Sequence, residues 1–452
     1  MKRLHLGAFE INGVNLTSQG LWAHPDNQTI RYNDLDYWIE IARILEGAGF
    51  DFLFFADSYG YPSIGGETPA VAFEQAAEIP KNDPMLLIPA LAAATSTLSF
   101  AVTTSTTFEA PYANARRFAT LDHLTRGRIA WNVVTTTSTV VSDLFGHDRF
   151  IPHDERYAIA EEYLQLSYQL FEGSWEDDAV VADKSARVYA HPQKVHRVSH
   201  DGAYFSSAGY FNSTPSPQRT PVIFQAGASK AGLAFAARNA EVVFLQGADS
   251  GKLRAQVDQL RALAADEGRD PRSITAIAGL STVVGDSVEN AEQKLADYLS
   301  YVDADAMRVY FAQMTGVDLT ALHPETELST LTTEQSRTQL TAHRGRTAAE
   351  AFADYVGRGG MRDLVLMGTG ADIAESMLQL AEETDLDGFN ITPYVSPSSY
   401  LEFAEHVSPH LRAAGAIEEA PAPATLRSRL SGSDRVPSVH PAARYRSVEV
   451  AR

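Results

Sequence analysis

The feature that most constrains the fold is a regular alternation of short apolar segments with amphipathic segments along most of the chain. The segment "LDYWIEIARILEGAG" (35–49) has apolar residues at helical spacing and ends at a glycine, which is a common helix stop. The next residues, "FDFLFFAD" (50–57), form a nearly continuous apolar run, typical of a parallel strand covered on both faces. The same pattern predicts strands at 4–9, 50–57, 98–106, 129–135, 221–227, 241–247, 274–285 and 388–394.

Eight strands separated by helices predict an α/β protein with a TIM-type (β/α)8 barrel. An open, doubly wound sheet is the alternative, but no GxGxxG turn follows the first strand, which weakens its dinucleotide-binding form. We expect a single barrel over 1–415, with insertion segments at about 58–82, 174–220 and 303–347. Long loops of this kind are often lids. Residues 416–452, rich in Pro, Ala, Ser and Arg, are expected to form a poorly ordered tail or an arm on a neighbouring subunit.

Composition excludes several classes of protein. The net charge of −20 leaves no basic stripe with which to bind nucleic acid. The absence of cysteine excludes disulfides, thiolate nucleophiles and zinc–thiolate sites. No apolar run approaches the ~20 residues of a membrane span, and the apolar part of the amino terminus is too short for a signal peptide. We therefore expect a cytoplasmic protein without a membrane partner.

Barrel enzymes carry their functional groups at the carboxyl ends of the strands. In this chain those positions hold small polar residues, with neither a pair of carboxylates nor a Ser-His-Asp set, a composition that suits cofactor binding. Asp57 ends an apolar strand, where a carboxylate is more often functional than structural; capping of the following turn is the alternative. Strand alternation places Trp131 and Asn132 on opposite faces, and we expect Asn132 to face the barrel interior.

The stretch "VIFQAGASKAG" (222–232) leads from a strand through a glycine turn into a helix. An anion, most simply a phosphate, fits the start of such a helix, although Ser229 would also serve as an ordinary N-cap.

In "HDERY" (153–157), His153 and Tyr157 are four residues apart and so share a helix face. They form a weak metal pair, because tyrosine is an uncommon ligand. The alternatives are a dipole-stabilised Asp154 with Tyr157 in the core, or two donors to a cofactor anion. The thirteen histidines show no HxH or HExxH spacing, and no metal site is predicted.

Several long blocks, taken together and in order, resemble the bacterial-luciferase-like flavin-dependent monooxygenases. Within these, they are most similar to the branch of the nitrilotriacetate, EDTA and dibenzothiophene-sulfone monooxygenases. The resemblance runs from about residue 4 to about residue 415. It includes "YNDLDYWIEIARILEGAGFDFLFFAD" (32–57), "ARRFATLDHLTRGRIAWNVVTT" (115–136), "HDERY" (153–157), "SPQRTPVIFQAGASKAGLAFAARNAEVVFL" (216–245) and "GFNITPYVSPSSYLEF" (388–403).

The resemblance implies a TIM-type barrel and a two-component system. A separate NAD(P)H:flavin reductase would supply FMN as FMNH2, and the monooxygenase would use O2 to form a flavin peroxide and insert one oxygen atom into a small organic substrate. No catalytic side chain is certain, because the flavin carries the chemistry while the protein binds it, orients it and excludes water. A homodimer or homotetramer is also implied.

Residue by residue, the resemblance implies a site for FMN. His153 and the helix dipole would supply local positive charge at the phosphate. The implied cofactor-binding residues are Gly227, Ala228 and Ser229 around the phosphate, His153 and Tyr157 on the phosphate side, and Asp57, Thr103 and Asn132 along the isoalloxazine and ribityl side.

The substrate pocket is where this chain departs from the family. The segments 10–20 and 58–80 contain no Arg or Lys, which favours a neutral or aromatic substrate over a polyanion. An aromatic, rather apolar wall is predicted from Phe9, Asn12, Tyr59, Tyr61 and Phe108, with barrel packing as the alternative role of these residues. Two other functions remain open: a deazaflavin-dependent hydride-transfer oxidoreductase, and a flavin-binding protein without catalysis.

Overall fold

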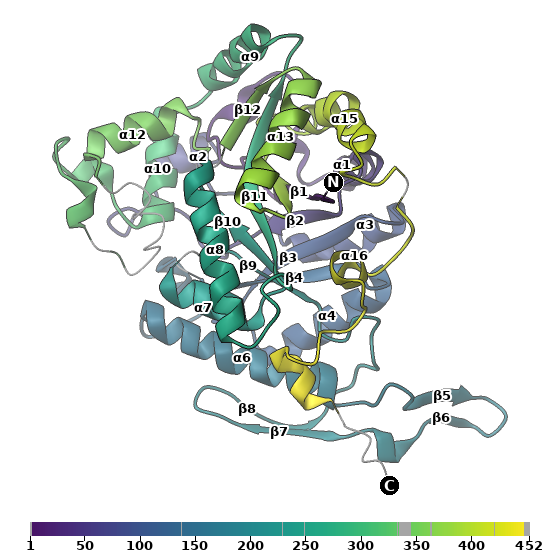
Figure 1. Ribbon diagram of the computed structural model, residues 1–452. Helices are drawn as coiled ribbons and strands as arrows, with labels where there is room; N and C mark the ends of the chain where they lie inside the picture. Colours follow the sequence, from purple (N-terminus) through teal and green to yellow (C-terminus); the bar gives the residue numbers. More distant parts are fainter. Residues whose placement is uncertain are drawn as a thin grey trace.

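A closed barrel of eight parallel strands organises the molecule (Figure 1). The computed structural model describes residues 2–136, 138–227, 229–247, 249–331, 333, 345–361, 364–419 and 421–446. Both the predicted strands and the predicted barrel are confirmed. In order around the barrel the strands are β1 (His5–Ile11), β2 (Phe52–Ala56), β3 (Ser99–Ser105), β4 (Ile129–Val134), β9 (Val222–Gln225), β10 (Val242–Leu245), β11 (Thr275–Val284) and β13 (Gly388–Ile391), which pairs with β1.

Helices between the strands cover the outside of the barrel (Figure 1). Helix α1 shows why these segments pack as they do: Asp34 caps its first turn, and its buried Trp38 lies against Phe55 of β2 with the ring centroids 5.3 Å apart. These helices include α1 (Leu35–Ala48), α3 (Ile88–Ala94), α4 (Pro111–Thr125), α6 (His153–Gly173), α7 (Lys230–Asn239), α8 (Ser250–Asp266), α9 (Val288–Ser300) and α13 (Gly370–Thr384).

Shorter helical elements complete the barrel layer. One continuous helical stretch has a π-helical turn in its middle, at Phe403–Val407, between α14 (Ser398–Glu402) and α15 (Ser408–Ala413). The other short elements are α2 (Ala70–Glu74), α5 (Val140–Leu144) and 3₁₀ turns at Leu21–Ala23, Thr29–Arg31, Pro84–Leu86, Pro192–Lys194, Leu319–Ala321, Leu328–Thr330 and Pro441–Tyr445.

Strand alternation sorts the side chains between the barrel interior and the helical ring. Inside, aromatic rings fill the lower half of the barrel; Phe54 and Phe244 lie 4.5 Å apart. Outside, Trp131 stacks on Phe118 of α4 at 5.3 Å. Asn132 faces inward, as predicted from its place beside Trp131. The aromatic packing leaves room for a ligand only toward the carboxyl ends of the strands.

The segment 174–220 forms two antiparallel hairpins, β5 (Val180–Asp183) with β6 (Val188–Ala190) and β7 (Arg197–Asp201) with β8 (Ser206–Tyr210). It leads from a helix into the amino end of β9, and Figure 1 shows the hairpins projecting from the end of the molecule opposite α9. None of its residues lines the cavity described below. This insertion is therefore a surface extension and not a lid.

The segment that begins at residue 303 has more regular structure than expected. It contains α10 (Ala304–Thr315), which packs through Met307, Tyr310 and Phe311 against α12 (Ala348–Gly357). A strand that the sequence did not predict, β12 (Leu364–Gly368), then pairs with the second half of β11. The sequence pattern did not predict α10, because its apolar stretch is short and polar, threonine-rich residues follow it. In the described ranges of the chain, no helix is both long enough and apolar enough to cross a membrane.

Residues 421–446 pack against the barrel of their own chain, where we expected a poorly ordered tail or an arm on a neighbouring subunit. The short helix α16 (Leu426–Ser431) places the fully buried Leu426 among interior side chains that include Val222 and Val242. Both valines are the first residues of their strands. The tail therefore closes the amino end of the barrel.

A buried ion pair holds this closure in place. Arg427, with no exposed surface, donates from Nε to Glu241 Oε2 (2.7 Å) and from Nη2 to Glu241 Oε1 (2.9 Å). It also donates to the backbone carbonyl oxygens of Gln218 (3.0 Å) and Thr220 (2.7 Å). Composition could not reveal this arrangement, because it depends on one arginine meeting a carboxylate far away in the sequence.

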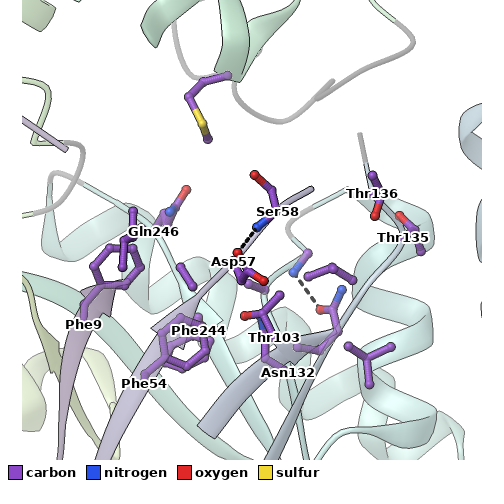
Figure 2. Close-up of a pocket in the computed structure, with 18 of the residues that line it drawn as sticks. Phe9, Phe54, Asp57, Ser58, Thr103, Asn132, Thr135, Thr136, Phe244 and Gln246 are labelled. Atoms are coloured by element: carbon purple, nitrogen blue, oxygen red, sulfur yellow. Dashed lines mark hydrogen bonds between the residues drawn. The ribbon is translucent and has the colours of Figure 1, made fainter. Parts of the chain in front are cut away.

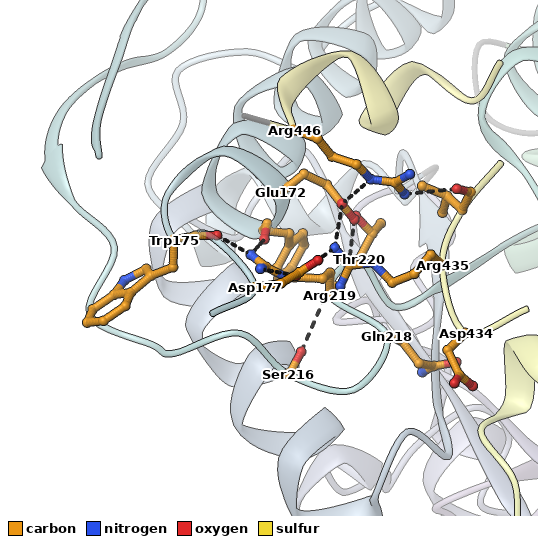
Figure 3. A network of polar contacts seen from close by, with 12 residues as sticks. Glu172, Trp175, Asp177, Ser216, Gln218, Arg219, Thr220, Asp434, Arg435 and Arg446 are labelled. Carbon is orange, nitrogen blue, oxygen red and sulfur yellow. Dashed lines mark hydrogen bonds and ion pairs between the residues drawn. The ribbon is translucent and has the colours of Figure 1, made fainter. Parts of the chain in front are cut away.

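A second polar network fixes the end of the tail to α6 and to the residues that precede β9 (Figure 3). Arg446 Nε donates to Glu172 Oε2 at 2.9 Å, and Thr220 Oγ1 donates to Glu172 Oε1 at 2.7 Å. Arg435 and Arg219 both donate to Asp177. The tail is thus joined to the rest of the chain through charged hydrogen bonds at Arg427, Arg435 and Arg446.

Candidate active site

A cavity of about 370 Å³ opens at the carboxyl ends of the strands. This is the end at which TIM-barrel enzymes carry their active sites, and the volume lies in the range of small-molecule and cofactor sites. Figure 2 shows part of its lining. Each barrel strand contributes to the wall, through Phe9, Phe54, Thr103, Asn132, Gln225, Phe244, Gly279 and Asn390.

The structure brings the predicted cofactor residues together around this cavity. Those that line it are Asp57, Thr103, Asn132, His153, Tyr157, Gly227 and Ser229, together with Phe9 from the predicted substrate wall. Ala228 lies outside the described residues.

The other predicted substrate residues do not line the cavity. Tyr59 and Phe108 pack on the ring of Phe145, with ring centroids 5.1 and 5.0 Å away. Asn12 is buried, and its backbone carbonyl oxygen accepts from the backbone N–H of Asn82. Tyr61 is half-buried in the loop after β2. These residues follow the strand ends by one to several positions, and there the loops have already turned away from the barrel axis.

Asn132 and Thr103 form a hydrogen-bonded pair on neighbouring strands. Asn132 Nδ2 donates to Thr103 Oγ1 (2.9 Å), which donates in turn to the carbonyl oxygen of Phe55 (2.8 Å). These bonds fix the orientation of the Asn132 amide, whose buried Oδ1 has no partner in the described part of the chain. A buried acceptor without a donor costs free energy, so a ligand that donates here is favoured. The N–H groups of a flavin ring and the hydroxyls of its ribityl chain are suitable donors.

The turn between β9 and α7 forms one corner of the cavity. Ser229 Oγ accepts the backbone N–H of Gly232 at 3.0 Å, so the predicted N-cap role is realised, and the same residue also lines the cavity. A Cβ at Gly232 would lie 2.8 Å from the Tyr157 hydroxyl oxygen and 3.0 Å from Gly227 Cα. Glycine therefore lets the helix start approach Tyr157, and the free N–H groups of this helix end favour an anion.

The start of α6 adds a cation that sequence reading missed. His153 and Tyr157 both line the corner, with ring centroids 5.2 Å apart, and Arg156, 1% exposed, lines it with them. Arg156 Nη1 donates to the carbonyl oxygen of Ile151 at 2.8 Å. The predicted pair, His153 and Tyr157, is four residues apart. The spacing of three between His153 and Arg156 also places residues on one helix face, and it would have found the arginine.

A second cation, Lys81, lies in the cavity wall just beyond the segment 58–80 that sequence reading found free of Arg and Lys. Its Nζ is 2.6 Å from Glu78 Oε2 and 3.2 Å from Ser58 Oγ. The charge of Lys81 is thus largely compensated by Glu78. Nearby, burial raises the pKa of Asp57 to about 6, and the positive charge of Lys81 opposes this shift.

The wall beneath α10 carries no charged side chain among the described lining residues. Its members include Ile11, Thr17, Tyr310, Met314 and Met361. Thr17 Oγ1 and Ser281 Oγ donate to Met361 Sδ at 3.1 and 3.3 Å, which holds the thioether in place. Strand β1 is four strands from β9 in either direction around the barrel, so this wall lies across the cavity from the anion corner.

Within the described ranges, no cluster of three or more His, Asp or Glu side chains is placed to hold a metal ion. The polar groups of the cavity are instead hydrogen-bond donors and acceptors around a space of cofactor size.

Comparison with known proteins agrees with this geometry. The chain matches the luciferase-like monooxygenase family over residues 12–388. It is 41% identical to a long-chain alkane monooxygenase of Geobacillus thermodenitrificans (strain NG80-2), across 99% of both proteins. It is 32% identical to nitrilotriacetate monooxygenase component A of Aminobacter aminovorans, across 95% of this chain and 96% of that protein.

Solved structures give the same result. A crystal structure of a riboflavin lyase with modified FMN and its substrate riboflavin superimposes with a TM-score of 0.95 and 43% identity, covering 99% of this chain and 100% of that one. The branch indicated by the sequence blocks is therefore confirmed.

Proposed function

We propose a specific reaction for this chain, which belongs to the luciferase-like monooxygenase family and is a flavin-dependent monooxygenase. In this proposal it uses FMNH2 and O2 to insert one oxygen atom into a small neutral or aromatic organic substrate. This proposal depends on one feature of the cavity: it has a cationic, donor-rich corner at one end and an uncharged wall at the other, with the unpaired Asn132 Oδ1 between them.

The residues present fit FMN. Gly227 and Ser229 would offer a backbone N–H and a hydroxyl to the phosphate at the start of α7, and Ala228 is assigned there by the same resemblance. His153, Arg156 and Tyr157 would complete the anion corner from α6. The modified FMN in the riboflavin lyase structure supports this choice of cofactor.

Along the rest of the cofactor, Asn132 would accept a hydrogen bond, Thr103 would hold its amide in place, and Asp57, which lines the cavity, would lie at the ring side. When bound, the reduced flavin would supply the electrons and react with O2. The protein's own contribution is to bind, to orient and to keep water out, and the phenylalanine rings below the cavity serve the last purpose.

A neutral substrate follows from the uncharged wall. An ionised group placed against Ile11, Met314 and Met361 would lose its hydration without gaining a partner, which is costly. The relatives reported above are named for an alkane, an aminopolycarboxylate and riboflavin, so the identity of the substrate does not transfer from them.

Two alternative functions, a deazaflavin-dependent oxidoreductase and a flavin-binding protein without catalysis, predict different behaviour. A deazaflavin-dependent oxidoreductase would turn over with reduced deazaflavin and consume no O2. A flavin-binding protein without catalysis would bind FMN and form no product. The monooxygenase names of the curated relatives favour the FMNH2 proposal.

A separate reductase is expected to be required for activity. The purified protein mixed with NADH, FMN and air should not consume NADH, because in a two-component system the transfer of electrons from NADH to FMN takes place on the separate reductase. Addition of an NAD(P)H:flavin reductase should start oxygen consumption, followed with an oxygen electrode. NADH oxidation by the protein alone would contradict the two-component proposal.

Replacing Ser229 by alanine is expected to weaken FMN binding by about 1–3 kcal/mol, the range for a lost hydrogen bond to a charged group. Isothermal titration with FMN measures the change. Ser287→Ala is the matched control: Ser287 caps α9 in the same way, by accepting from Asn290 N–H, but does not line the cavity. Both variants should lose about 1 kcal/mol of helix capping. Equal FMN affinities in the two variants would remove Ser229 from the phosphate site.

A further inference from the structure

Two carboxyl groups, a hydroxyl and an ammonium group lie together in the cavity wall beyond the end of β2. They belong to Asp57, Glu78, Ser58 and Lys81. Asp57 Oδ1 accepts the backbone N–H of Ser58 at 2.8 Å. In the described part of the chain this is the only hydrogen bond to the Asp57 carboxyl, which leaves Oδ2 available to a ligand. Figure 2 shows Asp57 among the lining residues, at the end of its strand.

The loop that carries Glu78 and Lys81 is held in an unusual conformation. Ala76 and Glu78 have φ angles of 51° and 61°, in the left-handed region that residues with a Cβ seldom adopt. Asn15 Nδ2 fixes this loop by donating to the carbonyl oxygens of Gln75 (2.7 Å) and Ala76 (3.0 Å). Such conformations persist only where the surroundings impose them, and they gather at functional sites. The loop therefore positions the Glu78–Lys81 pair beside Asp57.

We propose that Asp57 is a catalytic residue of this enzyme, whose carboxyl group donates the proton needed by the oxygen atom that leaves as water. The charges of Lys81 and Glu78 control how easily the Asp57 carboxyl group releases this proton. This inference rests on the proposed function. In the overall reaction FMNH2, O2 and the substrate give FMN, the oxygenated substrate and water. The flavin loses two electrons, one oxygen atom enters the substrate, and the other takes up two hydrogens. Where the reduced flavin is bound as its anion, one of these hydrogens must arrive as a proton, and Asp57 would give it and recover it from solvent.

The charges around Asp57 suit this task. Burial raises its pKa to about 6; Lys81 lowers the pKa, while Asp83 and Glu78 raise it. A general acid works best when its pKa lies near the operating pH. Tyr59, the next titratable residue along the chain, has its own pKa raised by burial and by nearby carboxylates, so it stays protonated.

The other ionisable groups that face the cavity come from different elements. His153 and Arg156 lie on α6 at the anion corner, together with Tyr157, and Tyr310 lies on α10. Asp57 is thus the carboxyl group at the ring side that is neither paired with a cation within hydrogen-bond distance nor fully exposed.

The first experiment titrates Asp57 in the protein without flavin. Infrared difference spectra between pH 4 and 8 should contain a protonated-carboxyl band that titrates near pH 6 and is absent from Asp57→Asn. Lys81→Met should move this titration to higher pH, because it removes a cation. Glu78→Gln should move it to lower pH, because it removes an anion and releases Lys81. A titration near the ordinary aspartate value would contradict the proposal. Shifts of both variants in the same direction would also contradict it, because Lys81 and Glu78 would then not act on Asp57 through their charges.

The second experiment tests the role. Enzyme loaded with FMNH2 is mixed with O2 in a stopped-flow instrument from pH 5 to 9, and FMN formation is followed by absorbance. Without a substrate the products are FMN and hydrogen peroxide, whose release needs the same proton. The wild-type rate should fall as pH rises through the Asp57 titration, whereas Asp57→Asn should be about 100-fold slower at low pH and show no such step. Asp249→Asn, which caps α8 outside the cavity, should keep the wild-type profile.

The outcomes separate this inference from the function on which it rests. If FMNH2 binds and Asp57→Asn retains the wild-type pH profile, the proton comes from another group and the inference is wrong. If the protein fails to bind FMNH2, the proposed function fails, and the infrared titration still reports whether the cluster exists.

Discussion

Replacing Arg427 by alanine is expected to destabilise the protein by about 3–5 kcal/mol, although this residue is close to the end of the chain and far from the cavity. The reason is the partner left behind. Glu241 is buried and accepts two hydrogen bonds from the guanidinium, and the positive charge of Arg427 lowers the Glu241 pKa against the effect of burial. Without Arg427 a carboxylate would remain in the barrel wall with no compensating charge.

Urea unfolding followed by circular dichroism measures this effect as a shift of the midpoint. Arg444→Ala is the matched control, since Arg444 lies in the same tail but is exposed and bonds only to the neighbouring Tyr445 hydroxyl in the described structure. A double variant, Arg427→Met with Glu241→Gln, should recover part of the loss, because neither charge is then left alone. If Arg427→Ala and Arg444→Ala unfold at the same midpoint, the ion pair does not hold the barrel closed.

Replacing Arg156 by methionine is expected to weaken FMN binding by about 2–5 kcal/mol, the cost of removing one partner from a buried, hydrogen-bonded charge pair. Arg156 is almost fully buried, lines the anion corner and is the permanent cation there. Methionine keeps most of the side-chain volume, so the change chiefly removes charge and hydrogen-bond donors.

Riboflavin provides the control for this prediction, since it has the ring and ribityl chain of FMN without the phosphate. Its affinity, measured by fluorescence quenching, should change little between the wild type and Arg156→Met, and Arg156→Lys should recover part of the FMN affinity. An equal loss for both ligands would place Arg156 at the ring, or would show that the substitution disturbs the start of α6.

Features that depend on neighbouring residues could be predicted from the sequence. Each of the eight barrel strands is a short apolar run in the sequence. The alternation of Trp131 and Asn132 correctly assigns one to the helical ring and the other to the cavity. His153 and Tyr157 meet at one corner because a helix brings residues four positions apart to the same face.

Features that depend on contacts between distant segments could not be predicted. Lys81 lines the cavity because Asn15, far away in the sequence, fixes the preceding loop. Tyr59 and Phe108 look like a substrate wall in the sequence, yet they pack on Phe145 of another loop. The tail reads as disordered from its composition, but the single side chain of Leu426 finds a place inside the barrel.

The closure of the barrel by its own last segment has a consequence for biosynthesis. Every strand of the barrel leaves the ribosome before α16 does. Until α16 has emerged, Val222 and Val242 lack the cover that Leu426 provides, and Glu241 lacks its counter-charge. Nascent chains stalled before residue 426 should therefore be more sensitive to proteases than chains in which α16 has emerged, so that the emergence of α16, and not that of β13, completes the barrel.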